Sequence, residues 1–314
     1  MARVRDFLAL CRFPAVFTAV ADPIAGAALA GYGGPLPPGI LAVSLVSGCI
    51  YLFGMVQNDL ADVDEDRATG KPRPIPQGRV TVGEATTFAR CLAGGGLAVA
   101  VAVDVFLIER FALPGQLTLA TLALLGAIWL YNRVAKETFF GPLAMGLCRG
   151  LNVGLGVAFA AVGTQQVLQR PVPSLGISVA TGMLGMTLYI AGVTAFASRE
   201  EGVSDRGGLL RSWMLSLVGL SLLLIATLTV YRSYADIKAI GLFVMIAVAG
   251  SYRVAAAVRD PSPPTVGRTV GSLILLIIVI DAAVVVGATG DEMASLGLVL
   301  LSIPAIALRR IRIT

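Results

Sequence analysis

Residues 58–74, NDLADVDEDRATGKPRP, hold four aspartates, one glutamate, two arginines and one lysine. Asn58, Asp59, Asp62 and Asp66 stand at positions i, i+1, i+4 and i+8, so a helix would place three of them on one face with Asp59 beside them. Like charges at this spacing repel, by about 0.2–0.5 kcal/mol per pair on an isolated helix. A divalent cation would neutralise them, and carboxylate oxygens suit Mg²⁺ while leaving sites free for phosphate oxygens. The spacing therefore predicts these four residues as metal ligands.

Cationic side chains follow immediately. Lys71 and Arg73 lie in GKPRPIPQGR, where Pro72, Pro74 and Pro76 stop the helix and stiffen the loop. Carboxylates for a metal and cations for phosphate thus arrive on one short segment. The alternative is a solvated loop of mixed charge.

The rest of the chain is strongly apolar. Of its 314 residues 56% are hydrophobic and 14% are charged, with a mean hydropathy of +0.84. A soluble domain carries about 25% charged residues. Apolar runs long enough to cross a hydrocarbon core of about 30 Å recur along the whole length. The composition therefore predicts an all-α, polytopic transmembrane bundle of nine to ten spans. A central cavity that opens to the cytoplasm, and a single domain over 1–314, are what a resemblance to a known family, given below, implies.

Ten apolar spans can be counted, and the loops between them alternate in charge. The short loops of one set carry only three arginines, whereas the other set is rich in arginine and lysine. The positive-inside rule places the rich set, including 58–84 and 198–211, in the cytoplasm and the protein in the cytoplasmic membrane. The net charge of +5 follows this topology, so no nucleic-acid partner is expected. The spans lie near 14–32, 39–57, 85–107, 116–132, 140–162, 174–197, 212–231, 236–257, 267–287 and 292–308.

Ionisable residues inside spans are functional candidates by default. Arg149 and Asn152 share a helix face at i,i+3, and we expect Arg149 to face the cavity and hold a diphosphate or a carboxylate; a buried structural ion pair is the alternative. Asp281 is expected to face the cavity, with a structural role as the alternative, and Asp104 is expected to be structural. Asp22 is a further embedded charge.

The chain has no histidine, and its four cysteines show no C-x-x-C spacing. Haem, histidine-ligated metals and a histidine general base are thereby excluded. Acid–base work and metal binding fall to carboxylates, lysine, tyrosine or water.

The segment at 58–74 resembles the first aspartate-rich motif of the UbiA-type intramembrane prenyltransferase superfamily, N-D-x-x-D-x-x-x-D followed by K-x-R-P. YNRVAKETFFGP resembles a further family stretch in Tyr131, Lys136 and Thr138, and CRFPAVFTAVADPIAG resembles the family's first span. The residues that match the first motif are Asn58, Asp59, Asp62, Asp66, Lys71, Arg73 and Pro74.

The family also carries a second motif, D-x-x-x-D, after the sixth span. In SREEGVSDRGG, Glu201 and Asp205 have this spacing, Glu200 is adjacent, and Arg206 follows as in the family. The resemblance implies that Glu200, Glu201 and Asp205 are metal ligands. Glutamate at the first position points toward a divergent branch such as the EboC-like subgroup.

The resemblance implies a Mg²⁺-dependent transferase in a lipid bilayer that moves an isoprenyl group from a polyprenyl diphosphate, geranylgeranyl or similar, to a small-molecule acceptor through an allylic carbocation. A terpene cyclase-like enzyme and a membrane transporter are the alternatives, although a transporter would be expected to show inverted repeats. The catalytic residues expected are Asp62, Lys71, Arg73 and Arg149. The residues expected to bind the metal and the diphosphate are Asn58, Asp59, Asp62, Asp66, Lys71, Arg73, Lys136, Arg149, Asn152 and Arg206.

Overall fold

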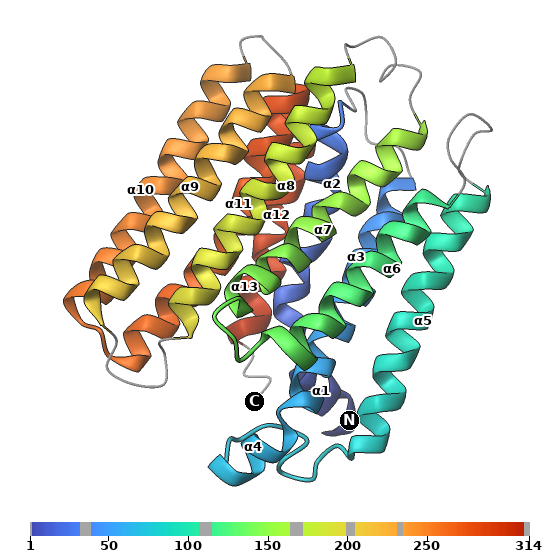
Figure 1. Ribbon diagram of the computed structural model, residues 1–314, viewed down its shortest axis with the longest axis vertical. Helices are drawn as coiled ribbons and strands as arrows, with labels where there is room; N and C mark the ends of the chain where they lie inside the picture. The colour runs from blue at the N-terminus through green and yellow to red at the C-terminus, as the bar shows by residue number, and fades with distance from the viewer. Residues whose placement is uncertain are drawn as a thin grey trace.

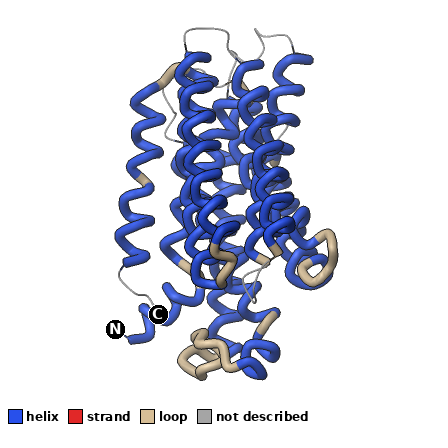
Figure 2. Tube along the Cα trace, turned by 90° about the vertical axis from the view of Figure 1, so that its left-hand side faces the viewer, coloured by secondary structure: helices blue, strands red, loops and turns tan. Residues whose placement is uncertain are grey.

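The structure, a computed structural model, describes residues 2–31, 39–106, 115–163, 172–198, 205–230 and 235–310. Regular structure in these ranges is entirely helical (Figures 1 and 2). The helices are α1 (Ala2–Leu10), η1 (Phe13–Ala15), α2 (Val16–Leu29), α3 (Gly39–Ala61), α4 (Val63–Thr69), α5 (Val82–Phe106), α6 (Gln116–Leu130), η2 (Tyr131–Ala135), α7 (Gly141–Gly163), α8 (Val172–Ala197), α9 (Arg206–Val230), α10 (Ala235–Arg259), α11 (Pro263–Thr289), α12 (Glu292–Leu300) and α13 (Ser302–Arg310).

Eight helices in the described ranges are long and apolar enough to cross a membrane, and a ninth span results if the bent pair Val4–Leu10 and Phe13–Leu29 is counted as one. This agrees with the lower of the two expected numbers. The expected tenth span, 292–308, is a shorter apolar segment that consists of two nine-residue helices, α12 and α13, on either side of Leu301, and its crossing of the membrane stays a prediction.

The long helices run roughly parallel and form one bundle (Figure 2). Helices α9 and α10 lie at one edge and α5 lies at the other, with α2, α7, α8 and α11 between them (Figure 1). The amphipathic segment α1, the short acidic helix α4 and the C-terminal end of α13 lie at the same end of the bundle (Figure 1). This end, the α4 end, therefore gathers the charged segments that the loop pattern predicts for the cytoplasmic side.

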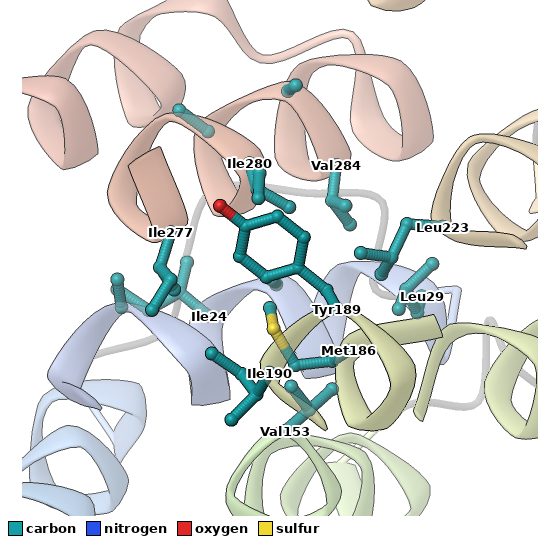
Figure 3. Packing of buried hydrophobic residues seen from close by; sticks show 14 of the residues in the cluster. Ile24, Leu29, Val153, Met186, Tyr189, Ile190, Leu223, Ile277, Ile280 and Val284 are labelled. Carbon is teal, nitrogen blue, oxygen red and sulfur yellow. The ribbon is translucent and has the colours of Figure 1, made fainter. Parts of the chain in front are cut away.

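The centre of the bundle is packed around Tyr189 of α8, which is fully buried (Figure 3). Its ring lies among Ile24, Ile280 and Met186 (Figure 3). Its hydroxyl donates a hydrogen bond of 2.8 Å to the carbonyl oxygen of Leu273 in α11. A buried hydroxyl without a partner would be costly, so this bond fixes α8 against α11.

Glycines let α2, α7 and α8 approach one another closely. A Cβ atom at Gly156 would stand 1.7 Å from the carbonyl oxygen of Pro23, and one at Gly146 would stand 2.1 Å from that of Thr187. The three glycines at 94–96 in α5 do not all lie at a helix contact. A Cβ atom at Gly96 would meet Ile50 and Cys49 of α3, whereas one at Gly94 or Gly95 would meet nothing within 4 Å.

The entry to the first span is bent by 53° between α1 and α2. Arg12 lies at this bend with φ of 47°, the only positive φ of a non-glycine residue in the described ranges. Such backbone strain persists only where the surroundings enforce it, and here Pro14 starts the next turn while Arg12 contacts α3. The bend therefore carries the Arg12 side chain to the end of α3, where the acidic motif begins.

Candidate active site at the α4 end of the bundle

A cavity of about 690 Å³ lies between α2, α3, α6, α7, α8 and α11, with α1 and α13 at its edge. Its size is typical of a small-molecule site, and apolar side chains make up most of its wall. Helices α9 and α10 supply none of its described lining residues. Its polar side chains include Arg12, Thr18, Asn58, Tyr131, Asn132, Arg149 and Asn152.

The acidic motif begins in the last turn of α3, where Asn58 and Asp59 are buried. Helix α3 ends at Ala61, and Asp62 occupies the junction with α4, which carries the fully buried Asp66. Backbone bonds from Asp62 N to Asn58 O, 3.1 Å, and from Asp66 N to Asp62 O, 2.8 Å, keep the helical spacing across the junction. The expected grouping on one face is therefore confirmed, although a break interrupts the helix.

The motif carboxylates converge on the guanidinium group of Arg73. Its Nη1 atom lies 3.2 Å from Asp59 Oδ1, 3.3 Å from Asp62 Oδ2 and 2.6 Å from Asp66 Oδ2. Partial burial acts to lower the pKa of Arg73, but these carboxylates outweigh it and raise the pKa above its usual value. Arg73 is thus the counter-ion of the acidic motif in this structure, rather than a cation set apart from it.

Three further cations surround the same carboxylates. Lys136, which follows the π-helical turn η2, donates to Asp62 Oδ1. Lys71 Nζ lies 3.6 Å from Asp66 Oδ1, and Arg12 Nη2 lies 3.5 Å from Asp59 Oδ1. Such π-turns occur often at functional sites, and this one carries Lys136 to the motif. The structure therefore brings the predicted residues Lys71, Arg73 and Lys136 together with the motif.

The motif offers the kind of donor atoms that Mg²⁺ prefers, although they are not arranged as a metal site. In the described residues no three acidic, cysteine or histidine side chains are arranged around a point ready for a metal ion. The carboxylate oxygens are nevertheless hard ligands gathered around one cationic atom, and Asp66 Oδ1 is buried without a hydrogen-bond donor. The donor chemistry of these carboxylates fits Mg²⁺.

The second acidic segment is described only from Asp205 onward, and Glu200 and Glu201 lie outside the described residues. Asp205 accepts bonds from the backbone nitrogens of Gly207, 3.1 Å, and Gly208, 2.7 Å, and so caps α9. Arg206 begins that helix and is exposed. Neither residue is among the described residues that line the cavity. Their assignment to metal and diphosphate stays a prediction.

The embedded charges form a second group deeper in the bundle. Arg149 and Asn152 both contact Asp22, which confirms that they share a face. Asp281 is fully buried and does not line the cavity, so the expectation that it faces the cavity is wrong. The reason is that its carboxyl group lies against Asp22 of α2. Asp104 accepts bonds from the backbone nitrogens of Leu117 and Thr118, 3.2 and 2.7 Å, and its structural role at the start of α6 is confirmed.

Sequence reasoning did not list Arg12 or the pairing of Asp22 with Asp281 as parts of a site. The signal for Arg12 is an arginine next to a proline at the start of the first span, which indicates a bent entry. The pairing of two aspartates 259 positions apart has no local signal, because it depends on how α2 and α11 pack.

A membrane bundle with an acidic motif beside basic side chains at one end of an apolar cavity defines a class of intramembrane enzymes. The chain belongs to the UbiA prenyltransferase family, whose model matches residues 19–204. It is an integral, multi-pass membrane protein.

Two curated relatives are named digeranylgeranylglyceryl phosphate synthase. The protein from Saccharolobus solfataricus is 26% identical over 170 residues, which cover 54% of this chain and 52% of that one. The protein from Methanoculleus marisnigri is 30% identical over 138 residues, 43% of this chain and 46% of that one. The chain thus matches about half the length of these relatives.

Solved structures share the fold. A digeranylgeranylglyceryl phosphate synthase structure superposes with a TM-score of 0.59 at 21% identity, covering 93% of this chain and 100% of that one. A UbiA homologue from Archaeoglobus fulgidus, bound to GPP and Mg²⁺, superposes with a TM-score of 0.57 at 18% identity, covering 89% and 99%.

Proposed function

We propose that this protein is a Mg²⁺-dependent prenyltransferase that moves an isoprenyl group from a polyprenyl diphosphate to a small-molecule acceptor, with the whole chain acting as one domain. The observation that carries the proposal is the convergence of Asp59, Asp62 and Asp66 on one cationic atom. This cluster lies where Asn58 joins the wall of a largely apolar cavity. The relatives' names and the diphosphate-bound homologue support the same reaction class.

The metal ion and the motif residues have different roles in this proposal. Mg²⁺, when bound, neutralises the negative charge that develops on the diphosphate as the allylic C–O bond breaks. Asn58, Asp59, Asp62 and Asp66 would hold it. Arg73, which borders the same carboxylates, would contribute its positive charge to the diphosphate oxygens.

Lys71 and Lys136 already border the motif and add positive charge where the leaving group forms. The apolar wall accommodates the isoprenoid tail and keeps water from the allylic carbocation. The acceptor's nucleophile then captures that cation, and a carboxylate or water takes the proton released. No histidine is needed for any of these steps.

The loop charges favour an orientation in which the α4 end faces the cytoplasm, within the cytoplasmic membrane. On this proposal the diphosphate reaches the motif from the cytoplasmic side, while the isoprenoid tail lies along the bundle and the lipid product leaves into the bilayer.

The test uses purified full-length protein in detergent with labelled geranylgeranyl diphosphate. Release of pyrophosphate together with a prenylated product is expected in Mg²⁺ and is expected to stop in EDTA. Pyrophosphate release with a cyclised product and no acceptor consumed would instead indicate a cyclase. Solute flux in vesicles without any diphosphate cleavage would contradict the enzyme and favour a transporter.

A further inference from the structure

Arg149 lies inside the bundle, away from the acidic motif. It is eight residues beyond Gly141, the first residue of α7, which corresponds to about 12 Å along the helix axis. It lines the same cavity as Asn58, and its side chain is 11% exposed. The cavity therefore has a cationic group in its wall in addition to those at the motif.

The guanidinium group of Arg149 is held from one side. Its Nε atom lies 2.6 Å from Asp22 Oδ2, and its Nη2 atom donates to the carbonyl oxygen of Thr18. Asn152 fixes the same Asp22 oxygen with a bond of 2.6 Å. The structure gives Nη1 no acceptor among the described residues. An arginine that is fixed by two groups and has donor capacity left over is prepared to bind an oxyanion.

Behind this pair lies Asp281 of α11, which is fully buried. Neither of its oxygens accepts a hydrogen bond from a described residue, and Asp22 Oδ1 also lacks a donor. The two carboxyl groups are within hydrogen-bonding reach of each other, and Arg149 is the cation that faces them.

One proton shared between Asp22 and Asp281 makes the charges of this cluster balance. Two carboxylates beside one guanidinium would leave a net negative charge in an apolar interior, where an unpaired ion is very costly and a carboxyl group keeps its proton instead. With the proton on Asp281, its hydroxyl donates to Asp22, and Asp22 with Arg149 forms a neutral pair. A neutral pair does not repel an incoming acid, whereas a net negative cluster would.

We propose that Arg149 binds the acidic group of the prenyl acceptor, a phosphate or a carboxylate, and that Asp281 is a positioning residue that fixes Asp22 and through it Arg149. This rests on the proposed prenyltransferase function. The donor's diphosphate has its own cations at the motif, namely Arg12, Lys71, Arg73 and Lys136. An anion at Arg149 is thus a second one, inside the cavity where the acceptor must meet the allylic carbon.

The first experiment measures binding to the purified full chain with the donor site filled by geranylgeranyl thiodiphosphate and Mg²⁺. The probes are geranylgeranylglyceryl phosphate, 4-hydroxybenzoate and the uncharged geranylgeranylglycerol. At least one acidic probe is expected to bind at least about ten-fold more weakly to Arg149→Gln than to the wild type, and Arg149→Lys is expected to recover part of the loss. The neutral probe should not distinguish the proteins.

The donor is measured separately. Arg149→Gln is expected to keep its affinity for geranylgeranyl thiodiphosphate within about two-fold, since charge-assisted bonds at the motif are unchanged. A loss of donor affinity alone, equal binding of the acidic probes to both proteins, or no binding of either acidic probe to the wild type would overturn the inference. Failure of the wild type to bind the thiodiphosphate would instead contradict the proposed function.

Asp281 is tested by two substitutions compared with thermal unfolding as a folding control. Asp281→Asn keeps a donor toward Asp22 and is expected to retain acidic-probe affinity within about two-fold, whereas Asp281→Ala removes the donor and is expected to weaken it about ten-fold. Equal loss in both variants, with both folded, would show that Asp281 does not act as a neutral donor and would overturn its positioning role.

Discussion

The two charged clusters of this protein differ in how firmly their ions are paired. At the motif, Arg73 and Lys136 are each 25% exposed; Arg73 contacts three carboxylates, and Lys136 contacts one of these, Asp62, at the junction of α3 and α4. Inside the bundle, Arg149 is 11% exposed, and its partner Asp22 is fully buried on a long helix. Asp66 of the motif is as fully buried as Asp22, so the two clusters differ in the exposure of their cations and not of all their carboxylates.

This difference suggests a division of roles. A site that binds a metal with a diphosphate and then releases pyrophosphate must let counter-ions leave and return, so partial exposure is useful there. A site that only orients one group benefits from rigidity, because fixed donors cost less ordering on binding. Substitutions in the two clusters should accordingly differ in whether they affect turnover or stability.

The largest effect is expected from removing both carboxyl groups of the inner cluster. Asp22→Ala combined with Asp281→Ala leaves Arg149 as a largely buried, unpaired charge. Breaking a buried pair in this way costs about 3–5 kcal/mol of folding free energy. Thermal unfolding in detergent checks this, with Asp281→Asn as the control that should unfold close to the wild type. A wild-type midpoint in the double variant would show that the inner cluster is not rigidly paired.

A somewhat smaller effect, on turnover rather than stability, is expected at the motif. Asp66→Asn removes one charge from the carboxylates around Arg73 while keeping the shape of the side chain. The rate of pyrophosphate release should fall roughly 100-fold, the size seen when one electrostatic contact to a transition state is lost. Raising the Mg²⁺ concentration should restore part of it. An unchanged rate would mean that Asp66 only holds the loop.

Lys136 is expected to contribute less. Lys136→Gln removes the cation that η2 places on Asp62, and the KM for the diphosphate should rise about ten-fold as one charge-assisted bond is lost. Arg133→Gln is the matched control, because Arg133 lies exposed in the same turn. Steady-state kinetics on both variants make the comparison, and equal behaviour would contradict a role for Lys136 in diphosphate binding.

The smallest effect is expected far from both clusters. Asp104→Ala removes the side chain that accepts bonds from the first turn of α6. A lost helix cap costs about 1 kcal/mol of folding free energy, so the unfolding midpoint should fall slightly. Pyrophosphate release at a temperature where the protein is folded should match the wild type; a lower rate would extend the site beyond the two clusters.

The helical membrane class and the position of most spans follow from hydropathy alone, since length and apolar composition are local properties. The span at 292–308 stays a prediction: the stretch is only 17 residues long, and hydropathy does not show that it consists of two short helices on either side of Leu301. The bend at Arg12 was also not predicted, since it depends on contacts between the start of α2 and the end of α3.

The acidic motif was predictable because its residues are close in sequence and helical spacing brings them together. The position of Arg73 was not predictable. The sequence shows that an arginine follows the carboxylates, but not that its side chain lies between them. We expected Asp281 to face the cavity because it is a charged residue within an apolar stretch of sequence. The packing of α11 on α2 instead turns it toward Asp22. Long-range pairing of this kind requires the fold.

The central claim is that the motif carboxylates act in diphosphate cleavage, and one pair of variants tests it most directly. Asp62 contacts Arg73 and Lys136, whereas Asp64, two residues later, is 94% exposed and pairs only with Arg67 in the described residues. Pyrophosphate release from geranylgeranyl diphosphate in Mg²⁺ should fall at least roughly 100-fold in Asp62→Ala and stay unchanged in Asp64→Ala, with both variants folded. Full activity in Asp62→Ala would contradict the account.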